Sequence, residues 1–397
     1  MRRSLFVSVT LVALFALLSA CNPSTVETRG RGNPPTVAAP AQFVEAQQPI
    51  TINNVANLKY LGRLDQPGTS STIFNETISP DDTRLVALNN EQVLAWNLLT
   101  GSLIFQTARS EATRVFYSSD KTEVYAIAPN GLVTVLDANT GAVKMNFPGN
   151  PSYSNSLAYS PDSGWLALGG TDGTVKIWDT YQRQSLATIN AHTGSVTALA
   201  FSTDGSQLVS AGADALVRVW HWNDRKMLTE TTLDAPVSIQ ALALAPDASY
   251  VAIGTERDAR LWSQSKPDEM YVLDTGRGGA NAVLKFSPDG RYVLAGNPTA
   301  GLSVWNIVKG TLTARLPDTQ GDTLASSFSP DGNLLLTSVL NSKVSLWNLV
   351  QVSGQTINQA TLDLGTQQIL DVNWTSDSRL MMFFDASGPI YLWGVGT

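Results

Sequence analysis

The chain has 397 residues, of which 43% are apolar and 15% charged, with 33 acidic against 26 basic side chains. This acidic balance, without a basic stripe carrying interleaved aromatic residues, argues against nucleic acid as a partner. The 30 glycines and 19 prolines, together with frequent valine, threonine and tryptophan, favour short strands and turns over long charged helices.

Residues 1–20 have the pattern of a secretory signal peptide. Arg2 and Arg3 form its positive end, and the apolar run from Leu5 to Ala20 is shorter than the roughly 20 residues that span a bilayer as a helix. The following LSAC, which ends at Cys21, resembles a bacterial lipobox, and this resemblance implies that Cys21 is lipidated and becomes the mature N-terminus. An ordinary cleaved signal and an uncleaved anchor are the alternatives. Cys21 is the only cysteine, so the exported body can form no internal disulfide.

Residues 21–49 are expected to form the lipidated cysteine and a disordered tether, because they are rich in proline, alanine and glutamine and lack apolar periodicity. Loss of Arg2 and Arg3 leaves 24 basic against 33 acidic side chains, a balance of −9. The folded domain is expected over residues 50–397. Signal and lipid together predict a protein held by its lipid on the extracytoplasmic side of a bacterial membrane.

One pattern recurs eight times beyond residue 50: an apolar strand, an SPDG-like turn, a second strand, a polar loop and a strand ending near tryptophan. The turns begin at residues 79, 118, 160, 202, 245, 287, 329 and 375. The strand-ending positions follow the same spacing, at Trp96, Leu136, Trp178, Trp220, Trp262, Trp305, Trp347 and Trp393. A period of about 42 residues with four strands per unit is typical of a β-propeller blade.

The repeats resemble the WD40 family, although only Trp178-Asp179 keeps the full dipeptide. The repeat at 191–232 is the most similar, and the resemblance implies a buried hydrogen-bond network there through His192, Ser210, Asp214 and Trp220. The other histidine, His221, stands where the aspartate of Trp-Asp usually lies. The role implied for this network is stability and not catalysis.

The last repeat stops after PIYLWGVGT and lacks an outer strand, whereas ANLKYLGR at 57–64 precedes the first blade with no partner of its own. In WD40 propellers the N-terminus often supplies the missing strand. The expected fold is therefore all-β, with eight four-stranded blades closed by an N-terminal strand, so that no sheet edge is left incomplete. Seven blades is the alternative. In that case the weak repeat at 111–148, which has Leu136 in the tryptophan position, would not form a blade.

No catalytic motif, calcium loop or metal-ligand cluster stands out, so no catalytic residue, metal or cofactor is expected. The segment DANTGAVK at 137–144 is similar to a turn of quinoprotein propellers, but that family's tryptophan is absent. Two function classes and a third possibility remain. The favoured one is a non-catalytic protein-interaction platform. The alternatives are an enzyme or cofactor-binding propeller, such as a lactonase or a quinoprotein, and a structural subunit in envelope assembly.

The two faces of the predicted ring differ. The turn face carries the SPDG-like turns with Asp81, Asp289 and Asp331, and the loop face carries the connections into each next blade. The loop face varies most between repeats and includes Tyr153, Arg257 and Arg277, residue types that often anchor interfaces. We expect a protein or peptide partner on the loop face, with the tether joining the propeller at the turn face.

Overall fold

The structure of the protein is a computed structural model, which describes residues 44–68, 71–160, 164–233, 237–275, 283–297, 301–316, 323–340, 343–350, 357–364 and 368–396. These residues belong to one compact unit, Gln42–Thr397. The expected signal peptide, Cys21 and most of the expected tether lie outside them. Within the described ranges no helix is long and apolar enough to span a bilayer. A short 3-10 helix, η1 (Val55–Asn57), precedes the first strand.

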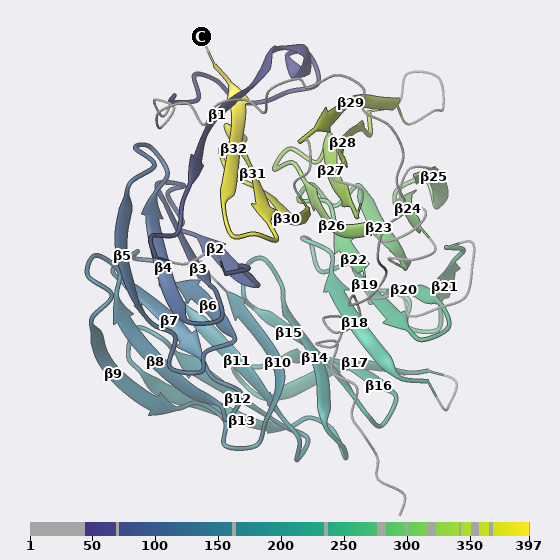
Figure 1. Cartoon of the computed structure of the whole chain (residues 1–397). Coiled ribbons are helices and arrows are strands. Elements are labelled where there is room, and N and C mark those ends of the chain that lie inside the picture. The colour runs from purple at the N-terminus through teal and green to yellow at the C-terminus, as the bar shows by residue number, and fades with distance from the viewer. Residues whose placement is uncertain are drawn as a thin grey trace, which may run out of the picture. The chain divides into compact units, whose positions relative to one another are not determined.

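The strands form eight four-stranded antiparallel sheets, which are the blades of a propeller (Figure 1). Blade 1 is β2–β5, each next blade takes the next four strands in order, and blade 8 combines β30–β32 with β1. The innermost strands are β2 (Asn75–Ile78), β6 (Arg114–Tyr117), β10 (Tyr153–Ser160), β14 (Val196–Phe201), β18 (Ile239–Leu244), β22 (Val283–Phe286), β26 (Thr323–Phe328) and β30 (Ile369–Trp374).

The second strands are β3 (Arg84–Leu88), β7 (Glu123–Ile127), β11 (Trp165–Gly170), β15 (Gln207–Gly212), β19 (Tyr250–Thr255), β23 (Tyr292–Asn297), β27 (Leu334–Val339) and β31 (Leu380–Asp385). The third strands are β4 (Gln92–Asn97), β8 (Leu132–Asp137), β12 (Thr174–Asp179), β16 (Leu216–His221), β20 (Ala259–Ser263), β24 (Gly301–Asn306), β28 (Lys343–Asn348) and β32 (Ile390–Val395). The outer strands are β5 (Leu103–Ala108), β9 (Val143–Pro148), β13 (Gln184–Asn190), β17 (Lys226–Thr232), β21 (Met270–Leu273), β25 (Thr311–Leu316), β29 (Ile357–Asp363) and β1 (Leu58–Leu64).

The SPDG-like turns fold by a local hydrogen-bond pattern that their sequence encodes. In blade 6, the Ser287 hydroxyl donates to Asp289 Oδ1 at 2.6 Å, and the same carboxylate oxygen accepts from the Arg291 N–H at 3.0 Å. The Tyr292 N–H in turn donates to Ser287 Oγ at 2.9 Å, which starts the second strand. Equivalent serine-to-aspartate or threonine-to-aspartate bonds occur at Ser79, Ser118, Ser202, Ser329 and Thr375. The aspartates of the turn face are thus engaged in holding the turns.

The blades associate through eight apolar clusters, each shared by two neighbouring blades. The cluster between blades 2 and 3, for example, contains Tyr125 and Val135 from one and Leu166 and Leu168 from the other. Burial of these side chains is the main driving force for the ring. The weak repeat forms a complete blade, β6–β9, in which Leu136 is buried in the tryptophan position. This confirms eight blades and rules out the alternative of seven.

The closing strand lies where the sequence predicted it. Strand β1 pairs antiparallel with β32 from Leu58↔Val395 to Leu64↔Ile390 and completes blade 8, and Figure 1 shows β1 beside β32. Leu61 and Leu64 of this strand are buried in the cluster between blades 8 and 1. The edge of β32 is therefore satisfied by backbone hydrogen bonds and by apolar burial together.

Residues 44–50 also pack on the propeller, so the tether expected over residues 21–49 ends earlier than predicted. The Val44 N–H donates to Leu61 O at 3.0 Å, and the Ile50 N–H donates to Ser378 O at 2.8 Å in the last turn of the turn face. Ala46 and Ile50 are buried among the clusters on the two sides of blade 8. Their apolar side chains pack on the propeller, which the proline-rich composition of this segment did not indicate. The chain thus enters the propeller at the turn face.

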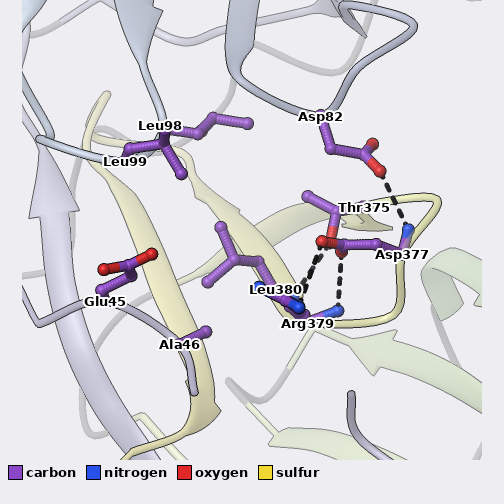
Figure 2. A pocket seen from close by; sticks show the side chains of 9 residues that line it. All are labelled: Glu45, Ala46, Asp82, Leu98, Leu99, Thr375, Asp377, Arg379 and Leu380. Carbon is purple, nitrogen blue, oxygen red and sulfur yellow. Dashed lines mark hydrogen bonds and ion pairs between the residues drawn. The ribbon is translucent and has the colours of Figure 1, made fainter. Parts of the chain in front are cut away.

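A carboxylate joins the first and last blades on the turn face (Figure 2). Asp82 accepts hydrogen bonds from the Ser376 N–H at 2.8 Å, the Ser376 hydroxyl at 2.6 Å and the Asp377 N–H at 2.9 Å. Asp82 has a φ of 58°, in the left-handed region where Gly290 and Gly332 stand in blades 6 and 7. The strain of a non-glycine residue there is offset by three bonds across the blade 8–blade 1 junction. A small hollow of about 40 Å³ lies beside this contact.

We predict that Leu64→Ala lowers the free energy of unfolding by about 2–5 kcal/mol, because it removes a fully buried side chain from the closing strand. Arg63→Ala is the matched control: its side chain on the same strand is 48% exposed and pairs only with Asp65, so the loss should stay below about 0.5 kcal/mol. Urea denaturation measures both values. Equal losses of unfolding free energy for the two variants would show that Leu64 of β1 does not pack in the core.

Candidate functional site

The structure brings together the four residues of the implied network in blade 4. His192 Nδ1 lies 2.8 Å from Asp214 Oδ1, and His192 Nε2 lies 2.8 Å from Ser210 Oγ. The Trp220 indole N–H donates to Ser210 Oγ at 2.9 Å. Because an indole N–H can only donate, the serine hydroxyl accepts from it and gives its own proton to the imidazole, which leaves the Nδ1 proton for Asp214. The chain of bonds runs from loop to strand inside the blade.

The protonation states of His192 and Asp214 fit a structural role for this network. Burial lowers the pKa of His192, opposed by Asp214, so the imidazole is neutral at neutral pH. Burial acts to raise the pKa of Asp214, but bonds from the Thr193 N–H and from His192 hold it below its ordinary value. The Asp214 carboxylate is fully occupied by His192, Thr193, Leu216 and Arg218. Neither group faces a cleft in which it could act on a substrate.

Half of the network recurs in blade 7, which the sequence reading missed. The Trp347 indole N–H donates to Thr337 Oγ1 at 2.9 Å, and Thr337 holds the position that Ser210 has in blade 4. A hydroxyl eight residues after the first turn residue is the signal that could have found it. Blades 1, 3 and 5 use backbone acceptors, as Trp178 does with Gly149 O at 2.9 Å, whereas the Trp305 and Trp393 indole N–H groups have no partner among the described residues. The indole rings therefore act mainly by packing, and the hydrogen-bond acceptor of the indole N–H differs between blades.

The loop face differs from expectation at one of its three candidate residues. Tyr153 is only 7% exposed and packs in the cluster between blades 2 and 3, so its ring is not available to a partner and that prediction was wrong. The physical reason is that β10 begins at Tyr153, which places the ring within the sheet rather than in the preceding loop. Arg257 is exposed between β19 and β20. Arg277 lies outside the described residues.

An aromatic–cation pair on the loop face was not predicted. The Arg109 guanidinium lies over the Phe74 ring, with its carbon 5.4 Å from the ring centroid. The Phe74 N–H bonds to Leu88 O and the Arg109 N–H to Glu91 O, which places both residues at the loop-face end of blade 1. Phe74 is 40% exposed, so the pair offers an apolar surface beside a positive charge. The segment before the first inner strand gave no motif to mark it.

A polar cluster also lies on the innermost strands and was missed. Burial and the neighbouring charge of Asp371 on β30 raise the pKa of Glu76 on β2 to about 8. Lys285 on β22 donates to Ser326 O and interacts with both carboxyl groups. Charged residues in the short apolar inner strands NETI, VLKF and ILDVNW were the available signal.

The described residues contain no cluster of metal-ligating side chains. No group of three or more histidine, cysteine, aspartate or glutamate side chains there is arranged to hold a metal ion. His221 is exposed and bonds to Asp224 Oδ1 at 2.9 Å, without a cleft beside it. The tryptophans outside the repeat position, Trp165, Trp222 and Trp374, pack between blades or bond to backbone carbonyls.

We predict that Asp214→Ala lowers the free energy of unfolding by about 1–3 kcal/mol, because it leaves His192 and the Thr193 N–H without their acceptor. The matched control is Asp172→Ala, at the equivalent position of blade 3, where the carboxylate accepts from Thr174 and no histidine is present. That loss should be smaller. Chemical denaturation of the two variants checks the difference, and an Asp214→Ala protein as stable as the control would contradict it.

Family models match most of the chain. Residues 66–307 match the model described as "Nucleolar protein 10-like, N-terminal domain", and residues 311–348 match "WD domain, G-beta repeat". The first match alone covers more than half of the chain.

Individual relatives match over shorter stretches. Target of rapamycin complex subunit wat1 of Schizosaccharomyces pombe is 38% identical over 88 residues, which cover 21% of this chain and 28% of that one. Periodic tryptophan protein 2 of Arabidopsis thaliana is 27% identical over 204 residues, 50% of this chain and 23% of that one. Target of rapamycin complex subunit LST8 of Saccharomyces cerevisiae is 27% identical over 203 residues, 50% and 64% respectively. Each match spans less than two thirds of the relative.

A solved structure shows the same architecture. The computationally designed Ika8 protein aligns with a TM-score of 0.68 over 83% of this chain and 98% of its own, at 23% identity, a likeness that concerns the fold alone. With the family models and the eight blades, this chain belongs to the WD40-repeat β-propeller family, and its residues 66–307 match the nucleolar protein 10-like N-terminal domain model.

Proposed function

We propose that the chain is a non-catalytic interaction platform that binds a protein or peptide partner on its loop face. The observation that carries this proposal is the Phe74–Arg109 pair on that face, in which the Phe74 ring is exposed, with Arg257 also exposed there. Aromatic and arginine side chains are the types that most often dominate binding energy at protein interfaces. The aspartates of the turn face are less available to a partner, because they accept hydrogen bonds within their own turns.

The relatives support the same class of function. Two of them are named as subunits of the target of rapamycin complex, which are proteins that work within an assembly. A rigid ring with variable loops suits this role, because its binding side chains are held by a scaffold that does not need to move. A structural subunit in envelope assembly would use the same surface, and the identity of the captured partner separates the two.

The enzyme and cofactor alternatives receive less support. A propeller that binds a cofactor or metal on its axis needs polar groups from several blades. Here the position of Glu76 is apolar in most other blades, where it is held by Val115, Leu157, Leu199, Leu242, Leu284 and Val372. The polar cluster is thus confined to one side of the ring, and no metal-binding group occurs in the described part of the chain.

We also propose that lipid on Cys21 anchors the protein on the extracytoplasmic side of a bacterial membrane. The sequence LSAC supports it, as does the short apolar run before it. The segment from Val44 packs against the turn face, so a tether from Cys21 would approach the propeller from that side. The loop face would then be biased away from the membrane and towards partners.

We predict that photo-crosslinkers placed singly at Phe74, Arg109 and Arg257 capture a protein in intact cells, whereas those at Asp81, Asp289 and Asp331 capture little. The first three lie on the loop face and the last three on the turn face. Mass spectrometry of the adducts checks this. Adducts confined to the second group would show that the turn face binds the partner.

We predict that Cys21→Ala releases the protein from the membrane fraction or leaves an unprocessed precursor in it, because the acceptor of the lipid is lost. Cell fractionation with immunoblotting follows both forms, and Ser19→Ala, which keeps the cysteine, serves as the control. A mature, lipid-free wild-type protein in the soluble fraction would refute the anchor.

A further inference from the structure

The Arg109 guanidinium differs from those of the other partly buried arginines. It lies over the Phe74 ring, with its carbon 5.4 Å from the ring centroid. Its N–H groups meet no hydrogen-bond acceptor and no carboxylate among the described residues. The other partly buried arginines that the structure describes all donate to a protein acceptor: Arg84, Arg114, Arg218, Arg260 and Arg291. Arg109 therefore carries a positive charge whose hydrogen-bonding capacity the fold leaves unused.

The backbone of blade 1 holds both members of this pair in place. The Phe74 N–H donates to Leu88 O at 3.1 Å, and the Arg109 N–H donates to Glu91 O at 3.0 Å. The Ala112 N–H donates to Arg109 O at 3.0 Å and closes the turn that follows Arg109. The ring and the guanidinium are thus attached to fixed points of the scaffold, so little ordering is needed when a partner binds.

The turn after Arg109 is also strained. Ser110 has a φ of 47° and Glu111 a φ of 64°, so two successive non-glycine residues are in the left-handed region. All other non-glycine residues with positive φ in the described ranges occur singly. Backbone strain of this kind is typical of positions that hold a functional group in a fixed direction.

The geometry of the pair suits a carboxylate. Stacking on an aromatic ring fixes the plane of a guanidinium and leaves the N–H groups at its edge available. Two of these N–H groups match the two oxygens of a carboxylate in a bidentate pair. Phe74 is 40% exposed, so part of its ring remains for an apolar side chain beside that carboxylate. One cationic and one apolar contact therefore lie next to each other.

The charges around Arg109 favour a carboxylate over a phosphate group. A phosphate ester carries about −1.5 to −2 charges at pH 7 and is usually bound by several arginines. Arg109 is one cation between two exposed acidic residues: Glu91, whose carbonyl accepts from the Arg109 N–H, and Glu111. These glutamates would repel a dianion more strongly than a single carboxylate, whose charge Arg109 alone can balance.

We propose that Arg109, stacked on Phe74, binds the side-chain carboxylate of an aspartate or glutamate in the partner, while an apolar neighbour of that residue covers the Phe74 ring. This inference rests on the proposed function, because it specifies a contact that the loop face makes. The carboxylate supplies the acceptor that the fold does not give to Arg109. The partner is recognised through a short segment in which an acidic residue stands beside an apolar one.

Peptide display on the purified full chain tests this contact. A phage library of random dodecapeptides is selected on the wild-type chain and depleted on Arg109→Gln. The remaining peptides should carry aspartate or glutamate beside an apolar residue. One of them is synthesised as its C-terminal amide, so that its side chains carry its only carboxylates, and its Kd is measured by isothermal titration calorimetry. Recovery of no peptide that depends on Arg109, or of such peptides without acidic residues, would overturn the proposal.

Arg109→Gln should raise the Kd of the selected peptide about 10- to 100-fold, because the charge-assisted hydrogen bonds are lost. Arg109→Lys should restore only part of the affinity, because an ammonium group cannot make a bidentate pair. The matched control is Arg225→Gln, which removes an exposed arginine on the turn face that also lacks an acceptor, and it should leave the Kd unchanged.

The peptide itself supplies the decisive comparison. Replacing its acidic residue by the corresponding amide should weaken binding to the wild-type chain as much as Arg109→Gln does, and should not weaken binding to Arg109→Gln further. Phosphoserine at the same position should bind less tightly than the acidic residue. An unchanged Kd for the amide peptide, or tighter binding of the phosphopeptide, would show that Arg109 is not a carboxylate site. These two measurements use the wild-type chain, so they decide the matter even if Arg109→Gln does not fold.

The result is separate from the test of the proposed function. Cellular adducts at Phe74 and Arg257, together with a peptide affinity that does not depend on Arg109, would keep the loop-face platform and reject the carboxylate contact. Absence of loop-face adducts in cells, together with an affinity that depends on Arg109, would instead refute the platform.

Discussion

The ring depends on one strand that arrives from the other end of the chain. Without β1, the last blade would be a three-stranded sheet with an open edge, and the clusters on both sides of it would be exposed. The closure has no covalent bond. It is secured instead by hydrogen bonds at both faces: by Asp82 on the turn face, and by Gln66 and Thr72 on the loop face.

The repeat stabilises the propeller although the blades differ in sequence. Each blade needs a turn that ends its first strand and an apolar surface towards each neighbour, and the serine–aspartate pattern and the eight clusters provide both. The indole N–H at the tryptophan position bonds to Ser210 in blade 4, to Thr337 in blade 7 and to Gly149 O in blade 3, whereas those of Trp305 and Trp393 have no partner among the described residues. The full histidine network is thus one solution among several, and the fold does not require it in every blade.

The proposed binding surface lies apart from the side chains that stabilise the turns. The aspartates of the turn face bond within their own turns, and this face also exposes Leu99, Tyr181 and Val308 between third and outer strands. The loop face carries Phe74, Arg109 and Arg257, which fold stability does not require to be exposed. The innermost strands also carry charged side chains: Glu76 and Asp371 are partly buried, and Lys285 is exposed.

The sequence by itself determined the architecture, because the features that encode it are local. The turn residues, the period of about 42 and the interrupted last repeat predicted strands, blades and closure, and His192, Ser210, Asp214 and Trp220 fall within one repeat. Only the tertiary structure showed the contacts between residues of different blades. Asp82 bonds to Ser376 only because closure brings residues almost 300 positions apart together, and Ile50 is buried only because blade 8 is complete. Tyr153 is buried, and not exposed in a loop, because its strand starts at that residue. Local pattern fixes the repeat, whereas contacts between first and last blades appear only when the ring closes.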